Sequence, residues 1–406
     1  MRRPVKTILM PDTSSTHESD GSSQTPPGAA DPPATEGSSR TLIDAATTAT
    51  TVAGDPPPDP PAPEGSSRTL IAAATTATTV AGDPPPAPRP TSREERAFRL
   101  RAGETVADGI RRAAGGQLAD SSEALAGVVH REELGEAIHG TRKSVKRMRA
   151  ALRLSRDTIG AATYEHENAA LRTIAGRLSG ARDAQVLIET LRALEQRAGD
   201  ELSPQTTQRL HARLEDDHTR EIAAMADDGD LAVATRRALE EARARTEQWS
   251  FEKPGFGAVK PGLRRVYGRG RKGLRAACED PTAENLHEVR KRVKDLWHAS
   301  ELLHAAHPKR MKRLARDLHE LSGLLGDHHD LSVLRDYAEV NPQLFTDMTA
   351  RATLLAVLDR RSDALQRRAL KLGRQLYKRP PKRFVKDVAR GWDKRVGSVA
   401  HRPPAG

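Results

Sequence analysis

The residues from His139 to Arg149 read HGTRKSVKRMR, and those from His287 to Trp297 read HEVRKRVKDLW. Both stretches contain the pattern His-x-x-Arg-Lys-x-Val-Lys, and the two copies are 148 residues apart. A second pair of related stretches follows at nearly the same offset: LRTIAGRLSGARDAQVL begins at Leu171, and LHELSGLLGDHHDLSVL begins at Leu318. Two motifs repeated in the same order predict that the chain contains two related halves.

The spacing of apolar residues after residue 91 is typical of helices. Apolar side chains recur every three or four positions rather than every second one, as expected where one face of an α-helix is buried. One such stripe consists of Ile138, Val145, Met148 and Leu152, and another of Leu286, Val289, Val293 and Leu296. The sequence therefore predicts an all-α fold in which consecutive helices pack as antiparallel hairpins.

Proline and glycine predict where these helices end, because both residues interrupt helical segments. The predicted breaks lie at Gly115–Gly116, 227–230, 254–257, Pro281, Pro308, 341–342 and 380–381.

A second stripe on the first motif is cationic. At about 100° per residue, five side chains fall within one arc: His139, Arg142, Lys146, Arg149 and Arg153. No acidic residue lies between positions 138 and 156, so these charges repel one another. The second copy keeps three members of the arc: His287, Arg290 and Lys294. Trp297 and Glu301 replace the last two arginines. The two stripes predict an anion-binding site, and a solvated basic face is the alternative.

The composition favours a polyanionic partner. The chain has 406 residues, with 66 Lys and Arg against 55 Asp and Glu. Residues 91–406 alone hold 60 basic and 45 acidic residues, a net charge of +15. No run of about 18 apolar residues occurs, which argues against a membrane protein. The single cysteine, Cys278, argues against a disulfide framework or a multi-cysteine zinc site. With no apolar segment after Arg2–Arg3, a cytoplasmic protein is expected.

Residues 1–90 are predicted to form a disordered tail. They are rich in Pro, Thr, Ala, Ser, Gly and Asp, and they contain a duplication with a period of 28 residues. The two copies, Glu36–Pro58 and Glu64–Pro86, differ only at Asp44 and Ala72. Such a segment buries too little apolar surface to offset the entropy lost on ordering. The folded part is therefore expected over 91–400, with halves of about 91–255 and 256–400.

Together these features resemble the CHAD family (conserved histidine α-helical domain). The matching stretches are HGTRKSVKRMRAALRL, LSGARDAQVL, LHEVRKRVKDLWHASELL and LLGDHHDLSVL. The resemblance covers about residues 92–395. It implies two pseudo-symmetric antiparallel four-helix bundles with a basic channel between them. It also implies binding of inorganic polyphosphate at polyphosphate granules, without catalysis, cofactor or metal. Other granule proteins are further candidate partners.

The resemblance also implies which residues bind polyphosphate, and all of them are basic or histidine. They are His139, Arg142, Lys143, Lys146 and Arg149 in the first basic helix, Arg182 in the turn after it, Arg264, Arg265 and Arg271 before the second basic helix, His287, Arg290, Lys291 and Lys294 within it, and His328 in a second turn at Gly326–Asp327. Arginine forms forked contacts with phosphate and lysine supplies a point charge. The histidines are expected to gain charge as the pH falls toward about 6.

Other functions and interpretations remain open at this stage. Nucleic acid is the second candidate partner, although the chain has few aromatic residues and no recognisable reader motif. A metal-dependent phosphohydrolase centred on His328 and His329, within Asp327–Asp330, is the third, but the first half has an arginine in the register of His329. Asp183 and Asp330 are interpreted as helix caps or as partners of basic neighbours. The stretch GRGRK at 268–272 is interpreted as part of the anion site or as a helix break.

Overall fold

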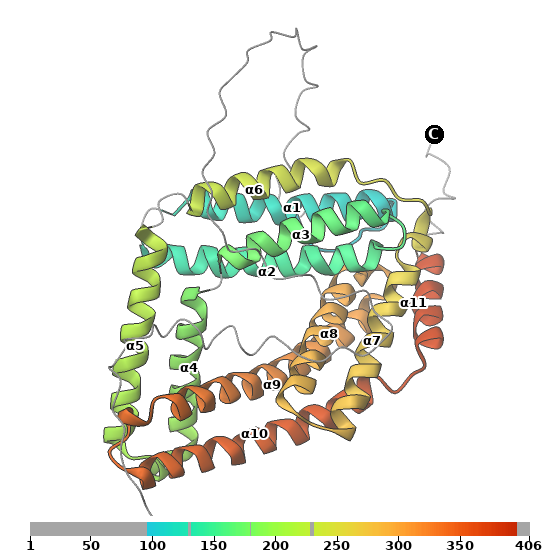
Figure 1. The fold of residues 1–406 in the computed structure, drawn as a ribbon. Helices are drawn as coiled ribbons and strands as arrows, with labels where there is room; N and C mark the ends of the chain where they lie inside the picture. Colours follow the sequence, from blue (N-terminus) through green and yellow to red (C-terminus); the bar gives the residue numbers. More distant parts are fainter. Residues whose placement is uncertain (1–95, 129–130, 179, 228–230, 396–406) are drawn as a thin grey trace, which may run out of the picture. The chain divides into compact units, whose positions relative to one another are not determined.

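A computed structural model describes residues 96–128, 131–178, 180–227 and 231–395, and within them the chain forms helices and turns with no strand. The α-helices of this part are α1 (Val106–Ala126), α2 (Arg131–Ser155), α3 (Ala161–Arg177), α4 (Gly180–Ala198), α5 (Pro204–Asp227), α6 (Leu231–Glu247), α7 (Lys260–Glu279), α8 (Ala283–Leu302), α9 (Pro308–Val340), α10 (Met348–Leu376) and α11 (Pro381–Arg395). The prediction of an all-α fold is confirmed (Figure 1). The predicted tail of residues 1–90 lies outside the described residues.

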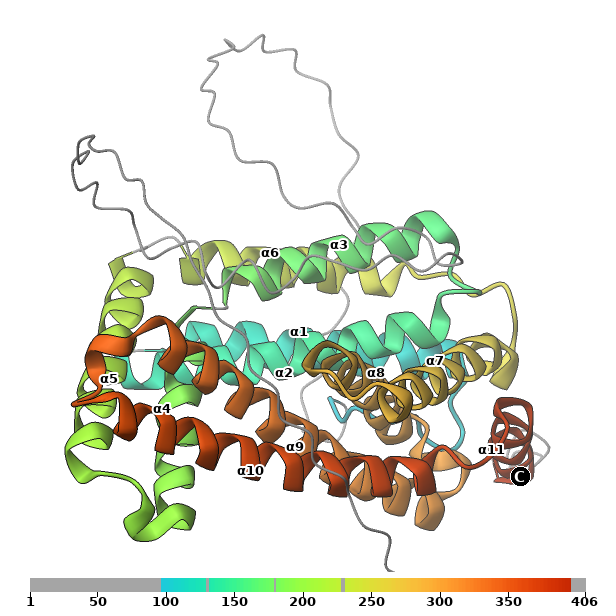
Figure 2. The same ribbon diagram turned by 60° about the horizontal axis from the view of Figure 1, so that its bottom comes forward.

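The helices form two groups of four that follow one another along the chain. In the first group, α1 and α3 each pack against both α2 and α6. In the second group, α8 and α10 each pack against both α7 and α9. The α4–α5 hairpin joins the first group to α9, and α11 covers α7 (Figures 1 and 2).

The predicted apolar stripes form the centre of the two groups. All eight of their residues are buried, and Leu152, Val289, Val293 and Leu296 are fully excluded from solvent. They belong to one continuous apolar cluster that extends from Phe98 to Trp392. Burying a side chain of this kind contributes roughly 1.5–3 kcal/mol.

No helix of the described residues is both long and apolar enough to cross a membrane.

Helices α2 and α8 cross each other, and two ion pairs tie them together. Arg147 Nε lies 3.5 Å from Glu301 Oε2, and Arg153 Nη1 lies 3.0 Å from Asp295 Oδ1. Each of these side chains is at most 24% exposed, so solvent screens the pairs less than it would at the surface. Glu301, which interrupts the second cationic stripe, therefore holds the two groups of helices together.

Most of the predicted breaks are confirmed, but the break at Gly115–Gly116 is wrong. Pro308 and Pro381 begin α9 and α11, and Pro342 lies between α9 and α10. By contrast, α1 continues through both glycines. A Cβ on Gly116 would lie 2.6 Å from Arg96 Cα. This glycine therefore allows the segment before α1 to pack against the helix.

The predicted second turn at Gly326–Asp327 is also wrong. In the first half, α3 ends at Arg177 and α4 begins at Gly180, but in the second half α9 runs without a break from Pro308 to Val340. Gly326 is buried, and a Cβ there would lie 3.1 Å from Arg290 Nη2. The helix-break interpretation of 268–272 fails in the same way, because α7 is continuous there.

Gly262 allows α7 to approach α2, and its substitution tests this packing. A Cβ at Gly262 would lie 2.7 Å from Leu154 Cα, on the backbone of α2. We expect Gly262→Ala to lower the free energy of unfolding by about 1–3 kcal/mol, because the helices must move apart. Urea unfolding followed by circular dichroism measures the change.

Gly268→Ala, on the same helix, is the matched control. Its Cβ would meet Pro381 Cγ at an ordinary 3.8 Å. Since alanine is the better helix former, this variant should be up to about 1 kcal/mol more stable than the wild type. Equal stability of the two variants would contradict the close contact between α2 and α7.

Candidate anion-binding site

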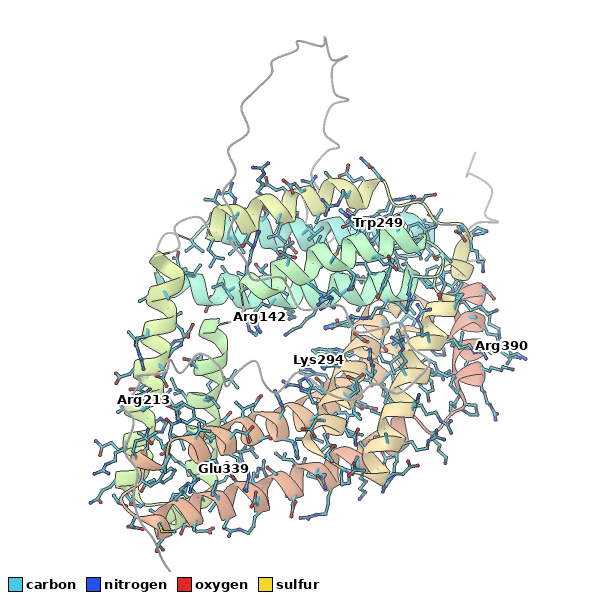
Figure 3. All side chains as sticks on the ribbon, in the orientation of Figure 1. Arg142, Arg213, Trp249, Lys294, Glu339 and Arg390 are labelled. Atoms are coloured by element: carbon cyan, nitrogen blue, oxygen red, sulfur yellow. The ribbon has the colours of Figure 1, made fainter. Side chains whose placement is uncertain are left out.

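Four cationic side chains from α2 and α8 meet near the crossing of these helices. They are Arg142 and Lys146 on α2 and Arg290 and Lys294 on α8, and we call them the central basic cluster. Lys294 interacts electrostatically with each of the other three. Figure 3 labels Arg142 beside α2 and Lys294 beside α8, on either side of the space between the two helices. The structure thus brings together members of both predicted stripes.

Lys294 is the most strongly perturbed member of the cluster. Burial, followed by the charges of Arg290, Lys146 and Arg142, lowers the pKa of its ammonium group to about 7. The carboxylate of Asp330 on α9 opposes this shift. A lysine with this pKa is about half charged at neutral pH. The charges of Arg290, Lys146 and Arg142 therefore all disfavour the protonated form of Lys294.

Arg290 is fixed in place by α9. Its Nη1 lies 3.8 Å from Asp330 Oδ1, and its guanidinium group lies against Gly326. Asp330 is inside α9, so of the two interpretations of this residue only the basic partner applies. Among the described residues, the buried Nε of Arg290 has no hydrogen-bond partner. A buried donor without an acceptor is costly, so an acceptor bound here would gain a favourable contact.

Two histidines lie beside the cluster. The ring centroids of His287 and His329 are 4.5 Å apart. Burial first, and then neighbouring cations including Arg290, lower the pKa of each ring to about 4. The expectation that His287 gains charge near pH 6 is therefore wrong for the unliganded protein. The Nδ1 atom of His287 is also buried without a hydrogen-bond partner among the described residues.

The predicted site included His328, but His329 is the residue that reaches His287. His328 is buried, and Asp363 on α10 opposes the lowering of its pKa by burial. The sequence of α9 already indicates that His328 is buried. His328 continues an apolar stripe with steps of three and four residues, formed by Leu321, Leu324, His328 and Leu331. His328 is thus on the core face, and His329 lies about 100° away from it.

The remaining predicted residues fall into two sets. His139, Lys143, Arg264 and Lys291 are exposed on α2, α7 and α8. Arg149, Arg265 and Arg271 instead contact other parts of the fold. Arg149 Nε donates to Asn168 Oδ1 at 3.1 Å, Arg265 Nη2 donates to Arg153 O at 2.9 Å, and Arg271 Nε donates to Tyr377 O at 3.2 Å. Burial and the charge of Arg153 lower the pKa of Arg149 to about 10. The side chain of Arg182 lies outside the described residues.

The structure gives no support to a metal site at Asp327–Asp330. Among the described residues, no three His, Cys, Asp or Glu side chains are grouped so that they could hold a metal ion. His328 and His329 also leave α9 in different directions.

The sequence matches the CHAD domain over residues 112–339, which is more than half of the chain and includes the whole central basic cluster. The chain belongs to the CHAD domain family. Two solved structures are similar to this CHAD protein. PptA from Streptomyces chartreusis is 18% identical with a TM-score of 0.49, and the match covers 68% of this chain and 100% of that one. The CHAD domain from the plant Ricinus communis is 20% identical with a TM-score of 0.47, covering 68% and 95%. No curated protein matches the chain.

Lys294 makes the stability of the CHAD domain depend on pH. Its pKa in the folded protein is about 7, whereas the ordinary value is 10.5. Between these values the unfolded chain holds a proton that the folded protein has released, so stability rises with pH across this window. Below pH 7 the ammonium group is charged in both states, and its full cost opposes folding.

Lys294→Gln removes this cost. At pH 6 we expect the free energy of unfolding of the variant to be about 1–2 kcal/mol higher than that of the wild type, a figure that allows for solvent screening. The difference should shrink as the pH rises toward 10. Denaturant unfolding in phosphate-free buffers measures it. Lys291→Gln, at an exposed position on the same helix, is the control and should show no such trend. A difference for Lys294→Gln that does not vary with pH would contradict the assigned pKa.

Proposed function

We propose that this CHAD protein binds long-chain inorganic polyphosphate at the central basic cluster and does not act as an enzyme. The observation that carries the proposal is the convergence of Arg142, Lys146, Arg290 and Lys294, with Asp330 as the acidic group identified beside them. Like charges held together in a folded protein oppose its stability, and a bound polyanion relieves the repulsion.

Polyphosphate suits the chemistry of this cluster. It is a flexible chain of negative charges with no bases to read, so binding requires closely spaced cations rather than stacking aromatic rings. The arginines offer forked contacts to phosphate oxygens, and the lysines offer point charges. The buried donor Arg290 Nε would gain an acceptor from a phosphate oxygen. Negative charge next to Lys294 would also raise its pKa again, so binding near neutral pH is expected to take up a proton.

The exposed residues extend the proposed binding surface beyond the cluster. Lys143 and His139 continue along α2, and Lys291 continues along α8. A long polymer could follow both helices, and this surface is our proposed equivalent of the basic channel expected from the sequence. Arg182 is proposed as a further contact. Association with polyphosphate granules in the cytoplasm is part of the same proposal.

Binding of the full chain to long-chain polyphosphate at two salt concentrations tests the proposal. Duplex DNA serves as competitor, and free phosphate is monitored throughout. We expect tight binding that weakens with salt, because counterions are released from the polymer as they are from nucleic acids. DNA should not displace the polymer, and no phosphate should be released. Ready displacement by DNA would favour the nucleic-acid function, and phosphate release would favour an enzyme.

The two lysines of the cluster allow a sharper test. We expect Lys146→Gln with Lys294→Gln to weaken polyphosphate binding about tenfold to a hundredfold, since each lost contact contributes about 1 kcal/mol or more. The dependence of affinity on salt should also become shallower.

A matched pair of lysines provides the control. Lys309 and Lys312 are exposed at the start of α9, away from the cluster, and their double glutamine variant also loses two lysines and at least as much positive charge. Its affinity should stay close to that of the wild type. Equal losses in both double variants would mean that only net charge matters, and the cluster would not be the site.

A further inference from the structure

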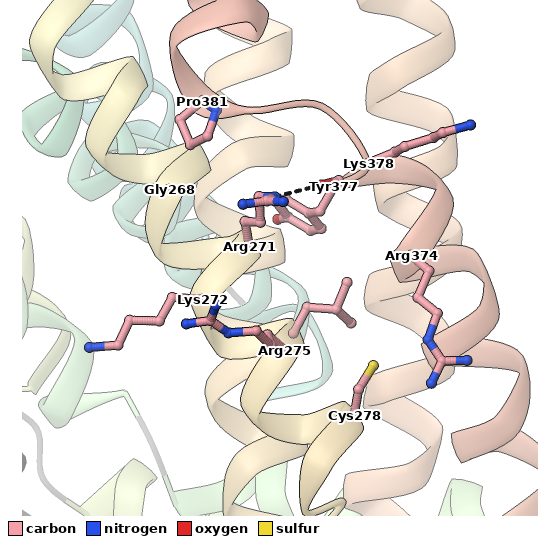
Figure 4. A pocket seen from close by; sticks show the side chains of 10 residues that line it. Gly268, Arg271, Lys272, Arg275, Cys278, Arg374, Tyr377, Lys378 and Pro381 are labelled. Carbon is pink, nitrogen blue, oxygen red and sulfur yellow. Dashed lines mark hydrogen bonds between the residues drawn. The ribbon is translucent and has the colours of Figure 1, made fainter.

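A second basic site lies between α7 and α10, at the beginning of α11. The structure has a cavity of about 420 Å³ here, and none of its lining residues belongs to the central basic cluster. Figure 4 shows Arg271 and Tyr377 together near one end of the cavity, with Cys278 and Arg374 at the other. Its volume is within the range of small-molecule binding sites.

The floor of this cavity is apolar and tightly built. Leu274, Cys278, Tyr377 and Pro381 contribute to its lining. Two glycines allow the helices to approach each other beneath it. A Cβ on Gly373 would lie 2.6 Å from Leu274 Cδ1, and one on Gly270 would lie 2.6 Å from the Tyr377 ring. The floor is therefore a fixed surface between packed helices.

The rim of the cavity is cationic. Its five charged side chains are Arg271, Lys272, Arg275, Arg374 and Lys378, and its lining includes no carboxylate. The hydrogen bond from Arg271 Nε to Tyr377 O, at 3.2 Å, holds one of the guanidinium groups over the cavity. Arg275 has a carboxylate on its own helix, Glu279, at 4.0 Å. The charge of this rim favours an anionic ligand.

We propose that this cavity binds a nucleotide-sized organic phosphate, with its phosphates on Arg271 and Arg374 and its ring on the floor around Leu274. Guanidinium groups bind phosphate oxygens in forked pairs. A flat ring gains from covering an apolar floor, whereas an inorganic phosphate chain has no group that would use it. This site is separate from the proposed polyphosphate site and does not depend on it.

Cys278 makes the proposal testable in the full-length protein, because it is the single cysteine of the chain and lines the cavity. Its reaction with dithionitrobenzoate reports on access to this site. We expect ATP to slow the reaction in a saturable manner. Adenosine should give no protection, and inorganic tripolyphosphate should protect at a concentration about tenfold higher than ATP, because it cannot cover the floor. Calorimetric titration with ATP gives the same affinities if the half-buried thiol reacts too slowly.

Variants of two arginines on α10 locate the bound nucleotide. Arg374 lines the cavity, and Arg367 is exposed on the same helix but does not line it. We expect Arg374→Ala to weaken ATP binding about tenfold, as for loss of a charged hydrogen bond. Arg367→Ala should leave ATP binding unchanged.

Three outcomes would overturn the proposal. In the first, ATP fails to protect Cys278 and gives no calorimetric signal. In the second, tripolyphosphate binds as tightly as ATP, so that the floor has no role. In the third outcome, the double variant Lys146→Gln with Lys294→Gln loses ATP binding, which would place the nucleotide at the central basic cluster. Loss of polyphosphate binding alone in that double variant leaves this proposal intact and concerns only the first site.

Discussion

The crossing of α2 and α8 is the contact on which the rest of the structure depends. It joins the two groups of helices, and both partners of each ion pair at the crossing are largely shielded from water. Arg147, three residues before Ala150 on α2, pairs with Glu301, three residues after His298 on α8. Arg153, three residues after Ala150, pairs with Asp295, three residues before His298. Ala150 and His298 are themselves 148 residues apart, which is the offset between the two sequence motifs. A duplicated chain with a twofold axis through the crossing would produce this reciprocal pattern.

The same crossing brings the cationic stripes together. The packing of the two helices places Lys294 near Arg142, Lys146 and Arg290, and burial, followed by the charges of these three residues, lowers the pKa of Lys294 to about 7. The apolar core beneath the cluster supplies the stability that this arrangement costs. Val145, Met148, Val289 and Val293 are nearly or fully buried on the same two helices. The same two helices thus carry both the buried apolar side chains and the cationic cluster.

The sequence predicted which side of each helix is apolar better than it predicted which other segments pack against that helix. A spacing of three and four residues fixes which side of a helix is apolar, so both stripes and the all-α fold followed from it. Glycine was misinterpreted at Gly116 and Gly326, because a helix break and a close contact with another segment require the same residue. Basic residues were similarly ambiguous. Arg265 has the composition of an anion site, yet it donates to the backbone carbonyl of Arg153, more than 100 positions away in the chain. Only the packing of distant segments reveals such partners.

A comparison of equivalent positions separates structural charge from functional charge. Under the offset of 148, Arg147 and Arg153 correspond to Asp295 and Glu301, and each arginine pairs with the acid that corresponds to the other. If both halves carried arginine at these positions, the crossing would be repulsive, so the exchange of charge in one half is a structural requirement. Arg142 and Lys146 correspond to Arg290 and Lys294, and here both halves are cationic although the side chains meet. The chain thus has opposite charges at the two ion pairs of the crossing, and it has cationic residues in both copies at the neighbouring positions, which is the arrangement expected if an anion binds there.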